Sequence, residues 1–270
     1  MLVEGLLERP VGRTWFRVTG ERGRTPLVCL HGGPGSTHNY FRPLERLADE
    51  RPVVLYDQLG CGRSDRPDDV EWTLATFTEE LDALRAHLGL DEVHLLGTSW
   101  GGMLALEHAL ARPESIEGLV LSSTLACAGD WEAEAKRLRD AIEGDDDEAL
   151  EEFERRHFFR GERAPLELVR MREERSVAVY EAMWGTNEWT MTGALAGWDV
   201  RARLGELTMP TLVIRGAHDL STAAISKTLT DGITNVREVV FEESSHTPVL
   251  EETERYLQVV RDFLYAVEGR

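Results

Sequence analysis

The sequence predicts an α/β protein in which a mostly parallel central sheet is covered by helices on both faces and carries an inserted helical cap. Short runs rich in Val, Ile and Leu alternate with helical segments up to residue 122 and again after residue 210. This alternation favours parallel strands joined by helical crossovers. Between the two regions, amphipathic helical periodicity replaces the strand pattern. With 270 residues, of which 42% are hydrophobic, the chain can bury a large core.

The predicted elements follow one another in a regular order. Gly12 lies between two β-compatible runs, residues 2–9 and 14–19, which predicts an N-terminal hairpin. Further strands are expected at residues 27–30, 53–56, 93–96, 118–122, 211–214 and 236–241. Helices are expected near residues 41–49 and 76–88, over 103–111, and from about Glu251 to the end of the chain.

The middle of the chain is predicted to be a separate cap. Residues 125–207 contain four helical patterns, at 131–142, 148–159, 166–176 and 177–184. The expected organisation is therefore a catalytic domain of residues 1–124 and 208–270 with a helical cap of residues 125–207. Such a cap provides substrate selectivity and excludes water. Trp184 and Trp189 are expected to face the cleft as substrate-binding residues or to form the core of the cap.

The most informative motif is Gly97-Thr98-Ser99-Trp100-Gly101, a G-x-S-x-G sequence between a predicted strand and a predicted helix. This context is that of a nucleophile elbow, where a serine occupies a tight strand-to-helix turn and glycines allow the neighbouring backbone to approach. The motif alone is also compatible with an ordinary glycine-rich turn. Its flanking elements favour Ser99 as a catalytic nucleophile.

The partners of such a serine follow from chain order, which in α/β-hydrolases is serine, then acid, then histidine. Asp219 follows a predicted strand, and His246 lies in the loop after the next one. Catalytic groups of parallel sheets collect at these strand ends. Asp219 and His246 are therefore the predicted acid and base, while Asp130 is an alternative acid and His218 a rival base.

A further glycine-rich loop is predicted to stabilise negative charge. Residues 31–35 read His-Gly-Gly-Pro-Gly and follow directly on a predicted strand. A tetrahedral oxyanion needs two preorganised donors. The expected donors are the backbone N–H groups of Gly33, in this loop, and of Trp100, after the nucleophile. The polar turn at residues 57–65 is expected to brace the loop.

Composition excludes several classes of function. The net charge of −19 argues against nucleic acid or an anionic membrane as a partner. No basic-then-apolar leader and no long apolar run is present, so a cytoplasmic protein is expected. The three cysteines, Cys29, Cys61 and Cys127, are scattered and predict neither a disulfide framework nor a metal cluster. No metal or organic cofactor is expected, and the sequence does not indicate the oligomeric state.

Together these motifs resemble the proline iminopeptidases and related tricorn-interacting aminopeptidases of the α/β-hydrolase fold. The resemblance rests on HGGPG at residues 31–35, DQxGxGxS at 57–64, GxSWGG at 97–102 and Ser245-His246. It continues into the cap at residues 152–157 and 183–189 and covers nearly the whole chain. It implies a serine peptidase that releases amino-terminal residues, typically proline.

The resemblance also implies how the substrate amine is held. The family binds it with acidic residues, and Glu188 matches the glutamate of the cap. A second family glutamate normally follows the catalytic aspartate, but this chain has Leu220 there. Glu154, Glu243 or Glu251 are possible replacements.

The resulting hypothesis is a serine hydrolase that cleaves amino-terminal proline or small apolar residues from peptides or aminoacyl amides through an acyl-enzyme. One alternative is a carboxylesterase or amidase of the same fold, which Leu220 would favour. The second alternative is a ligand receptor that retains the triad but turns over negligibly.

Overall fold

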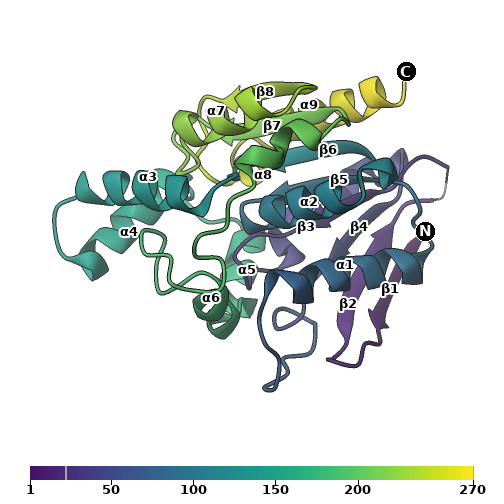
Figure 1. Cartoon of the computed structure of the whole chain (residues 1–270), viewed down its shortest axis with the longest axis horizontal. Coiled ribbons are helices and arrows are strands. Elements are labelled where there is room, and N and C mark those ends of the chain that lie inside the picture. Colours follow the sequence, from purple (N-terminus) through teal and green to yellow (C-terminus); the bar gives the residue numbers. More distant parts are fainter. Residues whose placement is uncertain (22, 270) are drawn as a thin grey trace.

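The computed structural model describes residues 1–21 and 23–269, and within these ranges eight strands form one sheet (Figure 1). The strand order is β1-β2-β4-β3-β5-β6-β7-β8. β1 and β2 form an antiparallel hairpin and β2 is antiparallel to β4, whereas the remaining neighbours are parallel. The strands are β1 (Leu2–Leu7), β2 (Thr14–Thr19), β3 (Leu27–Leu30), β4 (Val53–Tyr56), β5 (Val93–Thr98), β6 (Ile116–Ser122), β7 (Thr211–Gly216) and β8 (Val236–Phe241). The predicted fold class is thereby confirmed.

The topology reverses at β3. The chain passes from β3 to β4 on one side and then returns to place β5 on the other side of β3. In open parallel sheets, ligands bind outside the carboxyl ends of the strands at such a switch point. The loop after β3 carries Gly33, and the turn after β5 carries Ser99.

Helices cover both faces of the sheet, and the sheet separates two apolar cores. One core includes side chains from α1 (Leu74–Leu88), α2 (Trp100–Ala111) and α7 (Ala223–Gly232). The other includes side chains from the 3-10 segment η1 (His38–Asp49) and from α9 (Thr253–Val267). Two short helical segments, η2 (Pro113–Ser115) and α8 (Pro248–Glu251), also lie outside the insertion between β6 and β7. Two differences from the sequence prediction are that α7 was not expected and that η1, which contains Pro43, is 3-10 rather than α-helical.

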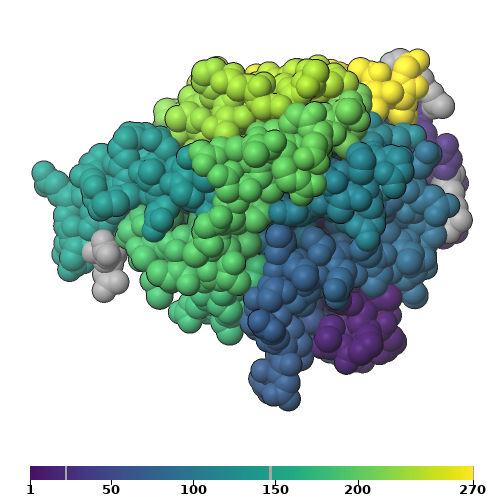
Figure 2. Space-filling view, viewed as in Figure 1, coloured from purple at the N-terminus to yellow at the C-terminus, as the bar shows by residue number. Residues whose placement is uncertain are grey.

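The residues between β6 and β7 form a helical insertion, the cap. It contains α3 (Ala128–Asp140), α4 (Asp146–His157), α5 (Leu166–Glu174), α6 (Val177–Met183) and the 3-10 segment η3 (Arg201–Glu206). In Figures 1 and 2, the teal helices α3 and α4 extend beyond the sheet on the side away from the C-terminus. The two ends of the cap meet, because Ala128 N–H donates to Trp198 O at 2.8 Å and Val200 N–H donates to Ala126 O at 2.9 Å.

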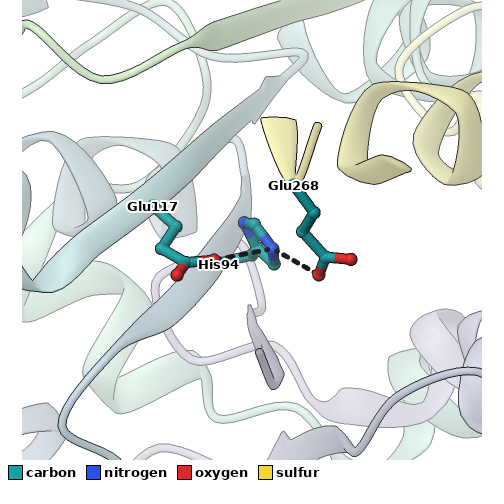
Figure 3. A group of neighbouring side chains, drawn as sticks. All are labelled: His94, Glu117 and Glu268. Carbon is teal, nitrogen blue, oxygen red and sulfur yellow. Dashed lines mark hydrogen bonds and ion pairs between the residues drawn. The ribbon is translucent and has the colours of Figure 1, made fainter. Parts of the chain in front are cut away.

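A charged cluster attaches the C-terminal end of α9 to the amino-terminal ends of the strands. The buried ring of His94 lies between the carboxylates of Glu117 and Glu268, with its Nε2 atom 3.6 Å and 3.3 Å from them (Figure 3). Arg51 and Arg24 also pair with Glu268. Two guanidinium groups therefore balance two carboxylates there, and burial keeps the pKa of His94 below its ordinary value.

No helix within the described ranges is long and apolar enough to cross a membrane.

Candidate active site

Ser99 occupies a strained turn between β5 and α2. Its backbone φ of 55° and ψ of −123° lie in a region that non-glycine residues rarely adopt. The glycines on both sides are sterically required. A Cβ atom on Gly97 would lie 2.2 Å from Gly101 O, and one on Gly101 would lie 1.9 Å from Leu30 O. The strain and the close packing are those of a nucleophile elbow, in which the hydroxyl is held at the sheet edge.

Asp219 and His246 lie together at the ends of neighbouring strands. His246 Nδ1 is 2.7 Å from Asp219 Oδ1, and both residues are buried. Burial lowers the pKa of His246, but the charge and hydrogen bond of Asp219 outweigh it, so this pKa lies above its ordinary value. Because Nδ1 is engaged by the carboxylate, Nε2 is the ring nitrogen left to accept a proton.

Glu251 fixes the loop that carries His246. Its carboxylate accepts hydrogen bonds from Ser245 N–H at 2.9 Å and from Thr247 N–H at 3.2 Å, on either side of the histidine. It also accepts from the Ser245 hydroxyl at 2.9 Å and from the Arg160 N–H at 2.9 Å. Glu251 is thus a structural partner of the base. The sequence only presented it as a possible amine anchor.

The loop after β3 has one peptide unit with a fixed direction. Gly32 N–H donates to the Tyr40 hydroxyl at 2.6 Å, whereas Gly33 N–H has no partner within the described residues. The carbonyl of the Gly32–Gly33 peptide lies 3.0 Å from His31 Nδ1 and accepts from Ser36 N–H at 3.3 Å. In a trans peptide the N–H points away from the carbonyl. Gly33 N–H is therefore both free and oriented.

His31 itself is held by Gln58. Gln58 N–H donates to His31 Nε2 at 3.0 Å, and the Gln58 side-chain amide donates to His31 O at 3.0 Å. The ring is fully buried, and burial lowers its pKa to about 4. Since Nε2 accepts, the neutral ring carries its proton on Nδ1 and donates to Gly32 O. Gln58 Oε1 also accepts from Trp100 Nε1 at 2.8 Å, so this turn does brace the loop, as the sequence predicted.

A single cavity joins these groups to the cap. Its volume is about 200 Å³, and Ser99, His246 and Gly33 line it on the sheet side. Glu188 lines it from the cap, half-buried, and accepts a hydrogen bond from the Tyr180 hydroxyl at 2.8 Å. Burial raises the pKa of Glu188. The cavity thus brings the Ser99 hydroxyl, the His246 imidazole and the Glu188 carboxylate into one space.

Trp184 and Trp189 do not lie on this cavity. Neither is among the described residues that line it, and both are buried. The Trp184 ring packs edge-on against Trp131, and the Trp189 ring against Phe153. Their large apolar area is used inside the cap, so direct substrate contact, one of the two roles expected from sequence, has no support in their placement.

The other residues considered from the sequence are paired with other groups, exposed or buried in the apolar core. Asp130 pairs with Arg201 at 3.1 Å on the surface of the cap, and His218 is exposed. Leu220 is 1% exposed and belongs to the apolar core, so it leaves the second acidic position of the family unfilled. Of its possible replacements, Glu154 lines the cavity but pairs with Arg172 at 3.0 Å, and Glu243 is exposed.

Sequence reasoning missed three features of this site: Tyr40 and Arg175 line the cavity, and Glu251 holds the loop that carries His246. Tyr40 and Arg175 belong to segments whose hydropathy pattern predicts only helices. Their contacts depend on how the cap and η1 fold back over the loop after β3. No local motif signals that arrangement.

The sequence is similar to known proteins over nearly its whole length. The family model described as alpha/beta hydrolase fold matches residues 25–253. A proline iminopeptidase of Clostridioides difficile is 41% identical, with 98% of this chain and 99% of that protein covered. A proline iminopeptidase of Lactiplantibacillus plantarum is 40% identical, with 94% and 97% covered.

Solved structures are also similar to this chain over nearly its whole length. A proline iminopeptidase of Mycobacterium smegmatis superposes with a TM-score of 0.90 at 34% identity, covering 98% of both chains. The structure of VinJ superposes with a TM-score of 0.92 at 36% identity, covering 98% of this chain and 99% of the other. The similarity therefore extends through the sheet and the cap alike.

Proposed function

The chain belongs to the proline iminopeptidase family of the α/β-hydrolases, and we propose that it releases amino-terminal proline or small apolar residues from short peptides through an acyl-enzyme on Ser99. The observation that carries this proposal is the shared cavity, where a strained serine, a histidine paired with a buried aspartate and a cap carboxylate meet. The family indicates the reaction class, and the contacts support the role that is proposed for each residue.

In the proposed reaction, His246 Nε2 takes the proton from Ser99 Oγ as the oxygen attacks the scissile carbonyl carbon. When the C–N bond breaks, His246 gives this proton to the leaving amine. A water molecule then attacks the acyl-enzyme with His246 again as base, which releases the amino-terminal residue and restores Ser99. Asp219 holds the imidazole in the required tautomer and stabilises its protonated form.

The N–H groups of Gly33 and Trp100 are the proposed oxyanion donors. Gly33 N–H is free within the described residues, and its peptide is held from the carbonyl side by His31 and Ser36. Trp100 is the first residue of α2, so its N–H has no acceptor within the helix. Donors that are already oriented need no rearrangement when charge develops, which makes their contribution to catalysis large.

Glu188 is the proposed anchor for the substrate ammonium. A cation in a partly dry cavity needs a carboxylate partner, and Glu188 is a half-buried carboxylate on the cap wall of the cavity. The Tyr180 hydroxyl fixes one of its oxygens. A bound ammonium would favour the ionised form of Glu188, which burial alone disfavours.

Residues 125–207 are proposed to act as the cap that selects the substrate. Phe153, Phe158 and Met171 bring apolar side chains from the cap to the same cavity, which suits an apolar first residue next to the anchored amine.

The test is a comparison of prolyl-β-naphthylamide, its N-acetylated form and a simple nitrophenyl ester. The proposal expects rapid hydrolysis of the free amine and a loss of at least tenfold in kcat/KM on acetylation, because the ammonium contact disappears. Preferential hydrolysis of the simple ester, together with failure to cleave the free-amine amide, would instead favour the esterase that Leu220 leaves open.

A further inference from the structure

One wall of the cavity carries a cation that the proposed reaction does not use. Arg175 ends α5 and lines the cavity together with Ser99 and Glu188. Its guanidinium has no ion pair or hydrogen bond to any residue in 1–21 or 23–269, and it is exposed. Its neighbour Arg172, by contrast, is paired with Glu154. Arg175 is thus an unpaired cation at the cavity of a chain that has 49 acidic and 30 basic residues.

The backbone holds Arg175 close to the reacting groups. Ser176 N–H, the next donor along the chain, donates to Gly35 O at 2.8 Å and so attaches this segment to the oxyanion loop. The Tyr180 phenol donates a hydrogen bond to Glu188 and is also affected by the charge of Arg175. Burial and the Glu188 carboxylate raise its pKa, whereas the Arg175 cation acts in the opposite direction. Arg175 and Glu188 therefore lie on the same cavity within electrostatic range of one hydroxyl.

We propose that Arg175 binds the terminal carboxylate of the substrate, so that the enzyme prefers free di- and tripeptides over longer or carboxyl-blocked peptides. This inference rests on the proposed function, because Glu188 must hold the other end of the same molecule. Arginine presents a planar fork of donors that matches a carboxylate with two parallel hydrogen bonds. The peptide backbone spans about 3.5 Å per residue, so only a short peptide brings both of its charged ends into one cavity.

The overall charge of the protein also favours a free dipeptide over an anionic ligand. A net charge of −19 disfavours the approach of anions in general. A free dipeptide is a zwitterion and carries no net charge. A local cation next to a local carboxylate selects such a molecule, whereas an amide or a naphthylamide with the same first residue would use Glu188 alone.

The experiment measures kcat and KM for Pro-Ala, for its carboxyl-terminal amide and for prolyl-β-naphthylamide. The wild-type enzyme is expected to show a three- to tenfold lower KM for the free acid than for the amide, with similar kcat. Arg175→Gln should raise KM for the free acid to the value of the amide and leave the other two substrates unchanged. Arg175→Lys should retain part of the preference, because it keeps the charge and loses the fork.

Arg170→Gln is the matched control, since Arg170 lies on the same helix, is exposed and is not among the described residues that line the cavity. It should change none of the three substrates. Equal KM values for the acid and the amide in the wild type would overturn the proposal, as would an equal effect of Arg175→Gln on all three substrates. Cleavage of the naphthylamide under those conditions would leave the aminopeptidase function intact, whereas no cleavage of any free-amine substrate would contradict both.

Discussion

The carboxylate of Glu251 holds His246 in place without touching its ring, through hydrogen bonds from the N–H groups of both neighbouring residues. His246, the proposed base, therefore has two carboxylate neighbours that make different contacts. Asp219 orients the imidazole and is hydrogen-bonded to it, whereas Glu251 fixes the backbone and adds negative charge that raises the pKa of His246.

Glu251→Gln should lower kcat/KM about 10- to 100-fold, because a displaced loop moves Nε2 away from Ser99. It should also move the acid limb of the pH profile of kcat/KM to lower pH, because one charge that raises the pKa of His246 is removed. Glu254→Gln, an exposed carboxylate at the start of α9, is the control and should change neither quantity. An unshifted pH profile would contradict an electrostatic role for Glu251.

Ser99→Ala and His246→Ala should each remove nearly all turnover, and the double variant should be little worse, because the two residues act as one unit. Single-turnover kinetics with an active ester would check this, since no burst of acyl-enzyme should form in either variant. Retention of more than about a hundredth of the wild-type kcat in Ser99→Ala would refute the proposed mechanism.

Asp219→Asn should lower kcat by about three to four orders of magnitude, because the amide no longer enforces the required tautomer of His246. The residual activity should persist to lower pH than in the wild type. In the wild type, Asp219 raises the pKa of His246, so the base is lost by protonation at a higher pH. Measurement of kcat/KM against pH for both proteins separates this effect from a general loss of folding.

Glu188→Gln should raise KM for free-amine substrates by one to three orders of magnitude and barely affect N-acetylated esters, which have no ammonium to hold. Glu181→Gln removes an equal charge from the edge of the same cavity and should have a much smaller effect. Equal changes for acetylated and free substrates would mean that Glu188 only shapes the cap.

Glu80 gives a prediction about stability. It is fully buried, accepts hydrogen bonds from the Thr14 hydroxyl and from Leu59 N–H, and burial raises its pKa from 4.5 to about 7. Between these two pH values the folded protein keeps a proton that the unfolded chain releases, so the contribution of Glu80 to stability falls as pH rises.

The wild type should therefore lose on the order of 2–3 kcal/mol relative to Glu80→Gln between pH 4.5 and pH 8. Urea denaturation of both proteins at several pH values measures this difference. A constant difference across the pH range would show that Glu80 titrates at an ordinary pKa in the folded state.

Much of the fold could be predicted because its signals are local. Parallel strands buried on both faces appear as short apolar runs, and the elbow needs two glycines around Ser99 whatever the rest of the chain does. Chain order and strand ends then suffice to propose Asp219 and His246, which the structure places in hydrogen-bond contact. The proposed acyl-transfer residues thus lie in segments that can each be recognised separately.

The substrate side could not be predicted in the same way. Trp184 and Trp189 are apolar at positions where packing inside the cap and contact with a ligand look identical in sequence. The 3-10 form of η1 and the unpaired state of Arg175 depend on long-range packing between the cap and the loop after β3. Only the three-dimensional arrangement decides which polar side chains reach the cavity.

The meeting of the two cap ends near Cys127 and Asp199 has a consequence for how this protein can be altered. Because the chain leaves and re-enters the sheet domain at adjacent points, closing the gap after removal of the cap requires only a short linker. Ser99, Asp219 and His246, the proposed nucleophile, acid and base, all lie outside the excised segment. A helical segment from a different hydrolase with similarly spaced ends can therefore replace the insertion only if it also covers the apolar residues of the sheet that share a core with the insertion; such a graft would give the same acyl-transfer chemistry a new set of substrates.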